Sequence, residues 1–200
     1  IATEIRREFP DTTIVMGGVH PTVDPRAALD CLAVDLVVRG EGEQTMLEIA
    51  QGRKRETIKG LAYRQRGTIH ITEDRPLLPN LDVLPLPAYH LLPMERYRPA
   101  VGAYQRLPAM AMQTGRGCPG RCQFCCPTFK GKVRRRSPER ILQEVQLLYS
   151  VYGIREVSFY DDTFTAVRTH VEEFCRGLID REIDISWSCF TRADHIDRSL

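Results

Sequence analysis

The sequence predicts an α/β protein in two parts: a sheet of parallel strands covered by helices, and then the opening strands and helices of a (β/α) barrel. Three features support this prediction. Short apolar runs alternate with segments of helical periodicity in both parts. A stretch rich in proline, at residues 76–99, separates them. Glycines, cysteines and acidic residues follow the predicted strands, where such folds bind ligands.

The composition limits the class of protein. The 200 residues are 42% hydrophobic and 27% charged, which is typical of a globular protein with a core. The net charge of +2 is too small to favour nucleic acid, and no apolar run approaches the ~20 residues of a transmembrane helix. Seven cysteines without a signal peptide indicate reduced thiols and a cytoplasmic location. Because the chain begins inside a predicted helix and ends just after a predicted strand, we expect a fragment of a longer protein.

The first part predicts two strand–helix units. Residues 1–9 have the pattern of an amphipathic helix that Pro10 closes, and the strands are predicted at 12–16 and 34–38. A glycine turn follows each strand, at 17–22 and 39–43, and helices begin at Pro25 and near Gln44. His20, in the first turn, fits a helix cap or surface residue better than a metal ligand.

A hairpin is predicted next, from residues 57–63 and 67–72 around the turn Arg64–Gly67. Its alternating pattern predicts one buried side, formed by Leu61, Tyr63, Ile69 and Ile71. We expect the first domain to cover residues 1–75, the proline-rich linker 76–107 and the second domain 108–200.

The second part predicts strands at 107–113, 157–160 and 183–190. Ser137 and Pro138 are a helix start, and Gly153 ends that helix; another is predicted at 168–181. Helical spacing predicts that these helices bury Ile141, Leu142, Val145, Leu148, Tyr149, Val171, Phe174, Leu178 and Ile179. Three cysteines outside the turns fit small core residues, namely Cys31, Cys175 and Cys189.

The turn after the strand at 107–113 carries the chemistry. Cys118, Cys122 and Cys125 follow a CxxxCxxC spacing within a glycine-rich loop, and thiolates select zinc, copper(I) or iron–sulfur clusters. A structural zinc site usually has four ligands, whereas three sulfurs on a cubane cluster leave one iron open for reaction. Cys126 is ambiguous and fits a thiol on the substrate side. The basic run Lys130–Arg136 fits a solvated loop or charge balance beside the thiolates.

CxxxCxFC after an apolar strand resembles the cluster loop of the radical S-adenosylmethionine (radical SAM) enzymes. The resemblance implies a [4Fe-4S] cluster on Cys118, Cys122 and Cys125, with SAM on the fourth iron. It also implies reductive cleavage of SAM to a 5′-deoxyadenosyl radical, and it places Phe124 beside the adenine.

The two glycine turns of the first part are similar to the second half of a Rossmann-like cobalamin-binding domain. This resemblance implies cobalamin contacts at Gly17, Gly18, Gly40 and Glu41. The fold class is then a partial cobalamin-binding domain followed by the first half of a radical SAM partial TIM barrel. A Rossmann-like domain that binds nothing is the alternative.

Polar residues also follow the other two strands of the second part. Asp161 and Asp162 fit a helix cap, a magnesium site or an acid pair, and the resemblance adds binding of the SAM ammonium group. Arg192 fits either a bidentate contact with the SAM carboxylate or a surface ion pair with Asp194.

Together these features predict a cobalamin-dependent radical SAM enzyme, which transfers a methyl group to an unactivated carbon or, as the sister chemistry, closes a ring. We expect a small-molecule substrate and a reductant such as flavodoxin or ferredoxin, and we assign no catalytic residue. One alternative is a radical SAM enzyme without cobalamin, a cyclase or methylthiotransferase-like protein. Another is an electron-transfer or zinc-binding module. The family's SAM contacts on later strands are absent from this chain, so we expect it to be inactive alone.

Overall fold

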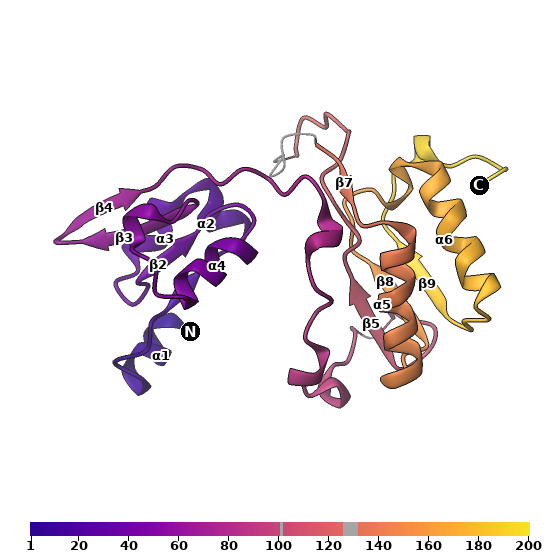
Figure 1. Ribbon diagram of the computed structural model, residues 1–200, viewed down its shortest axis with the longest axis horizontal. Helices are drawn as coiled ribbons and strands as arrows, with labels where there is room; N and C mark the ends of the chain where they lie inside the picture. The colour runs from indigo at the N-terminus through magenta and orange to yellow at the C-terminus, as the bar shows by residue number, and fades with distance from the viewer. Residues whose placement is uncertain (101, 126–131) are drawn as a thin grey trace. The chain divides into compact units, whose positions relative to one another are not determined.

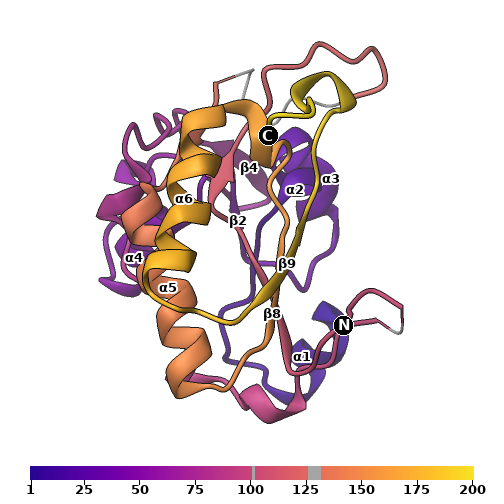
Figure 2. The same cartoon turned by 90° about the vertical axis from the view of Figure 1, so that its right-hand side faces the viewer.

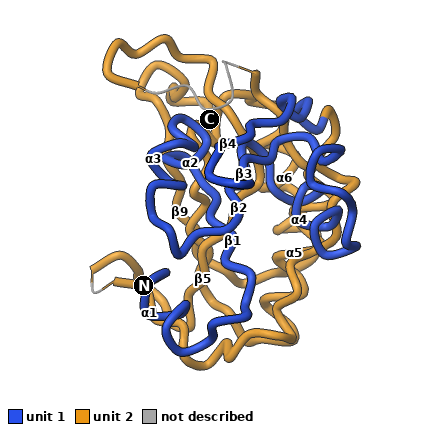
Figure 3. The backbone as a smooth tube through the Cα atoms, turned by 90° about the vertical axis from the view of Figure 1, so that its left-hand side faces the viewer, with its two compact units in different colours: residues 1–78 blue, residues 79–200 orange. Residues whose placement is uncertain are grey.

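The computed structural model describes residues 1–100, 102–125 and 132–200, and it divides into two compact units (Figures 1 and 3). Unit 1 is Ile1–Leu78 and unit 2 is Pro79–Leu200. Both are α/β structures with parallel strand pairs, so the predicted fold class is confirmed. The domain limits 1–75, 76–107 and 108–200 stay predictions. Cys126 and Lys130 lie outside the described residues. No helix in the described ranges is long and apolar enough to span a membrane.

Unit 1 is a four-stranded sheet in the order β1-β2-β3-β4 with helices on both faces. Its elements are α1 (Ala2–Glu8), β1 (Val15–Met16), α2 (Val19–Val23), α3 (Pro25–Asp30), β2 (Leu36–Val38), α4 (Glu43–Ala50), β3 (Leu61–Gln65) and β4 (Thr68–Ile71). Leu29 of α3 packs on one face of the sheet, against Val37. Ile49 of α4 packs on the other, against Leu36 and Leu61.

Strands β1 and β2 are parallel, with Val15 opposite Leu36. The two glycine turns that follow them therefore lie at the same edge of the sheet, as the sequence predicted. The first turn is shorter than predicted, because residues 19–23 form the helix α2. Gly18, at φ +105°, precedes this helix and reverses the chain in a conformation that other residues rarely adopt.

The hairpin β3–β4 exists, but its buried side differs from the prediction. A two-residue turn, Arg66–Gly67, sets the register and pairs Gln65 with Thr68. Tyr63 then lies opposite His70 and stacks on it, so the side chains of Ile69 and Ile71 lie on the other face from Tyr63. Ile71 is exposed, and Ile69 packs on the face of the sheet that α3 covers, with Leu29 and Val37.

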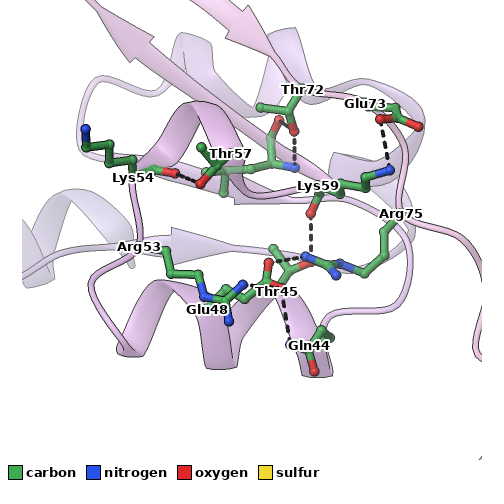
Figure 4. Close-up of polar contacts among 11 residues, drawn as sticks. Gln44, Thr45, Glu48, Arg53, Lys54, Thr57, Lys59, Thr72, Glu73 and Arg75 are labelled. Atoms are coloured by element: carbon green, nitrogen blue, oxygen red, sulfur yellow. Dashed lines mark hydrogen bonds and ion pairs between the residues drawn. The ribbon is translucent and has the colours of Figure 1, made fainter.

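A polar cluster attaches the chain that leaves the hairpin to α4 (Figure 4). Arg75 donates to Thr45 Oγ1 at 2.8 Å and forms an ion pair with Glu48, and Thr45 in turn donates to the carbonyl of Lys59 at 3.0 Å. Burial raises the pKa of Glu48, but hydrogen bonds from Arg75 and Gln44 outweigh burial and hold that pKa below its ordinary value. The segment that follows β4 is thereby fixed to unit 1.

Unit 2 contains a parallel sheet in the order β5-β8-β9, and α5 and α6 cover one of its faces (Figure 2). Its elements are β5 (Ala109–Met112), β6 (Gly115–Arg116), β7 (Arg134–Arg135), α5 (Pro138–Val151), β8 (Glu156–Phe159), α6 (Arg168–Asp180) and β9 (Ser186–Cys189). The register pairs Ala109 with Glu156 and Glu156 with Ser186. This order of strands and helices is that of an opening (β/α) barrel.

The core between this sheet and its helices contains most of the predicted side chains. Ile141, Val145, Leu148 and Phe174 are fully buried. Ile179 was predicted to be buried but is 75% exposed, because it lies on the solvent side of α6. Cys175 and Cys189 pack against this core as predicted, whereas Cys31 of unit 1 is exposed.

The predicted linker contributes to unit 2. Short 3₁₀ helices occur at Leu81–Val83, Tyr89–Leu91 and Met94–Arg96. The buried Tyr89 donates a hydrogen bond of 2.6 Å to Glu144 of α5, and Arg136 forms an ion pair with the same carboxylate. Burial and the neighbouring Glu144 raise the pKa of Tyr89. Tyr89 therefore fixes this segment to α5.

The stability of unit 2 should depend on the ionisation of Glu156. Its buried carboxylate accepts hydrogen bonds from the backbone N–H groups of Gln105 (2.8 Å) and Arg106 (2.7 Å). Burial raises its pKa, but these bonds outweigh burial and hold it below the ordinary 4.5. Since the folded-state pKa is the lower one, we expect the stabilisation to be complete above pH 4.5 and to be lost as the pH falls through the folded-state value.

Urea unfolding across this pH range tests the expectation. Glu156→Gln should lower the free energy of unfolding by about 1–3 kcal/mol at neutral pH, because both N–H groups donate to the same oxygen, Oε2, and a neutral amide oxygen accepts such bonds more weakly than a carboxylate oxygen does. The variant should also flatten the dependence on pH. Replacement of the exposed Glu182 by glutamine is the control. An unchanged pH profile in Glu156→Gln would contradict this role.

Candidate active site

The cysteine loop projects from a two-stranded ribbon at the carboxyl end of β5. Strands β6 and β7 pair Gly115 with Arg135 and Arg116 with Arg134. The ribbon is closed tightly at Gly117, which has φ +93°, because a Cβ there would lie 2.1 Å from the carbonyl oxygen of Lys132. Only glycine fits this position, so the base of the loop is fixed.

Asp161, at the end of β8, anchors the ribbon. Its carboxylate is 2% exposed and accepts two hydrogen bonds from Thr114, from the backbone N–H at 2.6 Å and from the hydroxyl at 2.5 Å. The side chain of Arg135, which is 9% exposed, lies 4.0 Å from the same carboxylate and donates to the carbonyls of Thr163 and Phe164. Burial lowers the pKa of Arg135, and the charge of Asp161 opposes this effect. The ends of β5 and β8 are thereby joined to strand β7 of the ribbon.

The sulfurs of the loop lie near polar groups from other strand ends. Gly120 N–H donates to Cys118 Sγ at 3.3 Å, and Thr163 Oγ1 lies 3.1 Å from the same sulfur. Arg192, after β9, places Nη1 3.5 Å from Cys122 Sγ. Cys125 is exposed, and Phe124 is 94% exposed.

These donors fit an anionic centre bound through thiolates. Cys118, Cys122 and Cys125 are all free thiols, soft ligands of the kind that iron–sulfur clusters take, and N–H groups beside such sulfurs are usual around a cluster. In the described part of the chain, however, no three His, Cys, Asp or Glu side chains form a group that could hold a metal ion. The donor set therefore supports the cluster assignment, and the placement of the sulfurs around one centre stays a prediction.

The two aspartates differ in what they offer a ligand. Asp161 is buried and occupied by Thr114, whereas Asp162 is exposed and accepts a bond of 3.2 Å from Gly117 N–H at the start of the loop. Of the two carboxylates, that of Asp162 is thus the one open to a ligand. Arg192 forms a bidentate pair with Asp194, at 3.0 and 2.8 Å, and these hydrogen bonds raise the pKa of Arg192.

In unit 1 the two glycine turns are linked through Thr22. Its hydroxyl donates to the carbonyl of Gly18 at 2.7 Å and accepts from Gly40 N–H at 3.0 Å. Gly17 and Gly18 are exposed, and a Cβ on Gly18 would meet no atom within 4 Å. Glu41 is 6% exposed, and its carboxylate accepts from Leu78 N–H at 2.7 Å, which argues for a structural role. The open glycine edge can accommodate the backbone approach of a ligand.

Sequence reasoning missed three threonines in these turns: Thr22, Thr114 and Thr163. Each contacts a residue that the sequence did identify: Thr22 contacts Gly18 and Gly40, Thr114 contacts Asp161, and Thr163 contacts Cys118. Threonine alone is too common in turns to be a signal. The basic run was expected to be either a solvated loop or a charge balance beside the thiolates. Arg135 and Arg136 fit a solvated loop poorly, because they contact protein groups rather than solvent.

Family models match both units. Residues 1–50 match the B12 binding domain, and residues 112–198, which include the cysteine loop and all three strand ends, match the radical SAM superfamily.

Residues 112–198 belong to the radical SAM superfamily, and residues 1–50 belong to the B12-binding family.

Curated relatives agree with this family. The chain is 37% identical over 194 residues to an uncharacterised methyltransferase of Pyrococcus horikoshii, covering 94% of this chain and 41% of the relative. It is 30% identical to an anaerobic magnesium-protoporphyrin IX monomethyl ester cyclase of Synechocystis, over 97% of this chain and 39% of the relative. It is 32% identical to cytidylyl-2-hydroxyethylphosphonate methyltransferase of Streptomyces wedmorensis, over 90% of this chain and 39% of the relative. This chain thus spans about two fifths of the length of these relatives.

Solved structures share the fold. The cobalamin-dependent radical SAM enzyme OxsB, with aqua-cobalamin and SAM bound, matches with a TM-score of 0.72 and 21% identity, over 99% of this chain and 28% of that chain. The radical SAM methyltransferase TsrM from Kitasatospora setae, with cobalamin and a [4Fe-4S] cluster bound, matches with a TM-score of 0.64 and 20% identity. The match covers 90% of this chain and 36% of that chain.

Proposed function

We propose that the protein is a cobalamin-dependent radical SAM enzyme that cleaves SAM reductively and transfers a methyl group to an unactivated carbon. The observation that carries this proposal is the cysteine loop at the carboxyl end of β5, which meets Thr163 and Arg192 from two further strand ends. Its position in a chain that matches both the B12-binding and the radical SAM families supports the same function.

Each proposed contact has a chemical task. Cys118, Cys122 and Cys125 would hold a [4Fe-4S] cluster, which when bound supplies the electron that cleaves SAM to methionine and a 5′-deoxyadenosyl radical. Asp162 would accept from the SAM ammonium group, Arg192 would meet its carboxylate, and Phe124 would border the adenine. Gly17, Gly18 and Gly40 would let cobalamin approach the backbone of unit 1. The substrate is a small molecule, the reductant a flavodoxin or ferredoxin, and the location the cytoplasm.

Ring formation is the second candidate, because the relatives include anaerobic cyclases as well as methyltransferases. The whole protein, purified without oxygen and reconstituted with iron and sulfide, should contain about four irons per chain and retain cobalamin. With SAM and a low-potential reductant it should release 5′-deoxyadenosine or S-adenosylhomocysteine. One zinc without sulfide, or a cluster spectrum that SAM does not change, would instead indicate a zinc-binding or electron-transfer module.

A substitution at Gly18 tests the cobalamin site. Gly18→Val should weaken retention of cobalamin at least about tenfold, because a β-branched residue at φ +105° must change the turn that approaches the cofactor. Gly52→Val is the matched control: Gly52 also has positive φ, +69°, with no atom within 4 Å of its Cβ position, but it follows the carboxyl end of α4. Cobalamin absorbance that co-elutes with the protein in gel filtration measures the effect. Equal retention by the two variants would contradict the assignment.

A further inference from the structure

Arg192 and two sulfurs of the cysteine loop meet around Gly120. Nη1 of Arg192 lies 3.5 Å from Cys122 Sγ. A Cβ on Gly120 would lie 2.9 Å from the same Nη1 and 3.3 Å from Cys118 Sγ. The absence of a side chain at Gly120 therefore leaves room for the guanidinium beside the loop, where Nη1 reaches Cys122 Sγ.

Asp194 determines which nitrogen of Arg192 faces the loop. Its two oxygens accept from Nε at 3.0 Å and from Nη2 at 2.8 Å. Because a guanidinium is planar and rigid, this bidentate pair directs the remaining nitrogen, Nη1, toward Cys122. The approach to the sulfur is thus held by a second residue.

A donor in this position has a known kind of effect on a cluster. The reduction potential of an iron–sulfur cluster depends on its net charge and on hydrogen bonds to its sulfurs. Reduction adds a negative charge, which an N–H donor and a nearby positive charge stabilise. Loss of this donor should make the cluster harder to reduce.

We propose that Arg192, oriented by Asp194, raises the reduction potential of the cluster bound by Cys118, Cys122 and Cys125. This proposal rests on the proposed function, since it requires the cluster. It differs from binding of the SAM carboxylate because its effect is present before SAM binds.

Redox titration of the whole, reconstituted protein without SAM, followed by electron paramagnetic resonance, tests the proposal. At a fixed solution potential, Arg192→Gln should lower the ratio of reduced to oxidised cluster about threefold to tenfold, and a tenfold change corresponds to about 59 mV for a one-electron couple. Asp194→Asn should change the ratio less than Arg192→Gln does, because lost orientation of the guanidinium lowers the ratio while loss of the nearby negative charge raises it.

Arg106→Gln is the matched control. Arg106 makes the same bidentate pair, with Asp184 at 2.8 and 2.8 Å, but Asp184 lies before β9, at the opposite end of the strand from Arg192. Its substitution removes the same charge and should leave the ratio unchanged.

The outcomes separate the two proposals. If Arg192→Gln and Arg106→Gln give the same ratio, the inference is wrong; weaker SAM binding in that Arg192 variant would then make the residue a SAM contact only. If the wild-type protein assembles no cluster of about four irons, the proposed function fails and this inference fails with it.

Discussion

Replacing any one of Cys118, Cys122 and Cys125 by alanine is expected to abolish the activity of the whole enzyme. Each thiolate would supply one of three protein bonds to the cluster, and the remaining two cannot hold it against loss of iron. Since residues that only support a ligand already cost 10–100-fold when they are replaced, we expect loss of a ligand to lower 5′-deoxyadenosine formation more than about 100-fold. Iron and sulfide content should fall in parallel.

Cys175→Ala is the control for this series. Cys175 is a free thiol of the same unit, half-buried on α6 against the core. Its loss removes one sulfur from the chain without touching the loop, so iron content and SAM cleavage should stay near those of the wild type. If a variant at Cys118 or Cys122 kept its iron while Cys175→Ala lost it, the assignment of the cluster to this loop would be wrong.

The sequence predicted the scaffold of this site well, because the scaffold depends on local rules. Ser137 caps α5 as its position before Pro138 suggested, with Oγ accepting from Arg140 N–H at 3.2 Å. Strands β5 and β9 occur within the predicted segments, and β8 begins one residue before its predicted segment, 157–160. The CxxxCxxC spacing identified the loop, because few motifs place so many thiols in so few residues.

The sequence could not predict contacts that depend on distant segments. Asp161 and Thr114 are 47 residues apart, and Arg192 and Cys122 are 70 apart. Two adjacent aspartates look alike in a sequence, and only the fold makes Asp161 an anchor and leaves Asp162 exposed. The hairpin was predicted, but the side chains on each of its faces were not. A turn one residue shorter or longer changes the register and exchanges the two faces of one strand, and the sequence did not define the length of the turn.

Replacing Asp161 by alanine is expected to destabilise unit 2 by about 2–4 kcal/mol. The substitution leaves the backbone N–H and hydroxyl of Thr114 without this acceptor in a buried position, and it removes the carboxylate that lies 4.0 Å from the largely buried Arg135. Asp161→Asn should cost less, because an amide oxygen can still accept from the N–H group. Urea unfolding of the whole protein, followed by a probe in unit 2 such as Trp187 fluorescence, measures the difference.

Asp162→Ala is the matched comparison, and it should give the opposite pattern. Its carboxylate is exposed and makes one bond of 3.2 Å, to Gly117 N–H, so the free energy of unfolding should change by less than about 1 kcal/mol. If the exposed carboxylate receives the SAM ammonium group, the affinity for SAM should fall about tenfold or more in this variant. A variant at Asp161 that kept its stability but lost SAM would reverse the two roles. Asp161 and Asp162 carry the same side chain and follow the same strand. Such a result would therefore show that burial does not tell which of the two aspartates is structural and which binds the ligand.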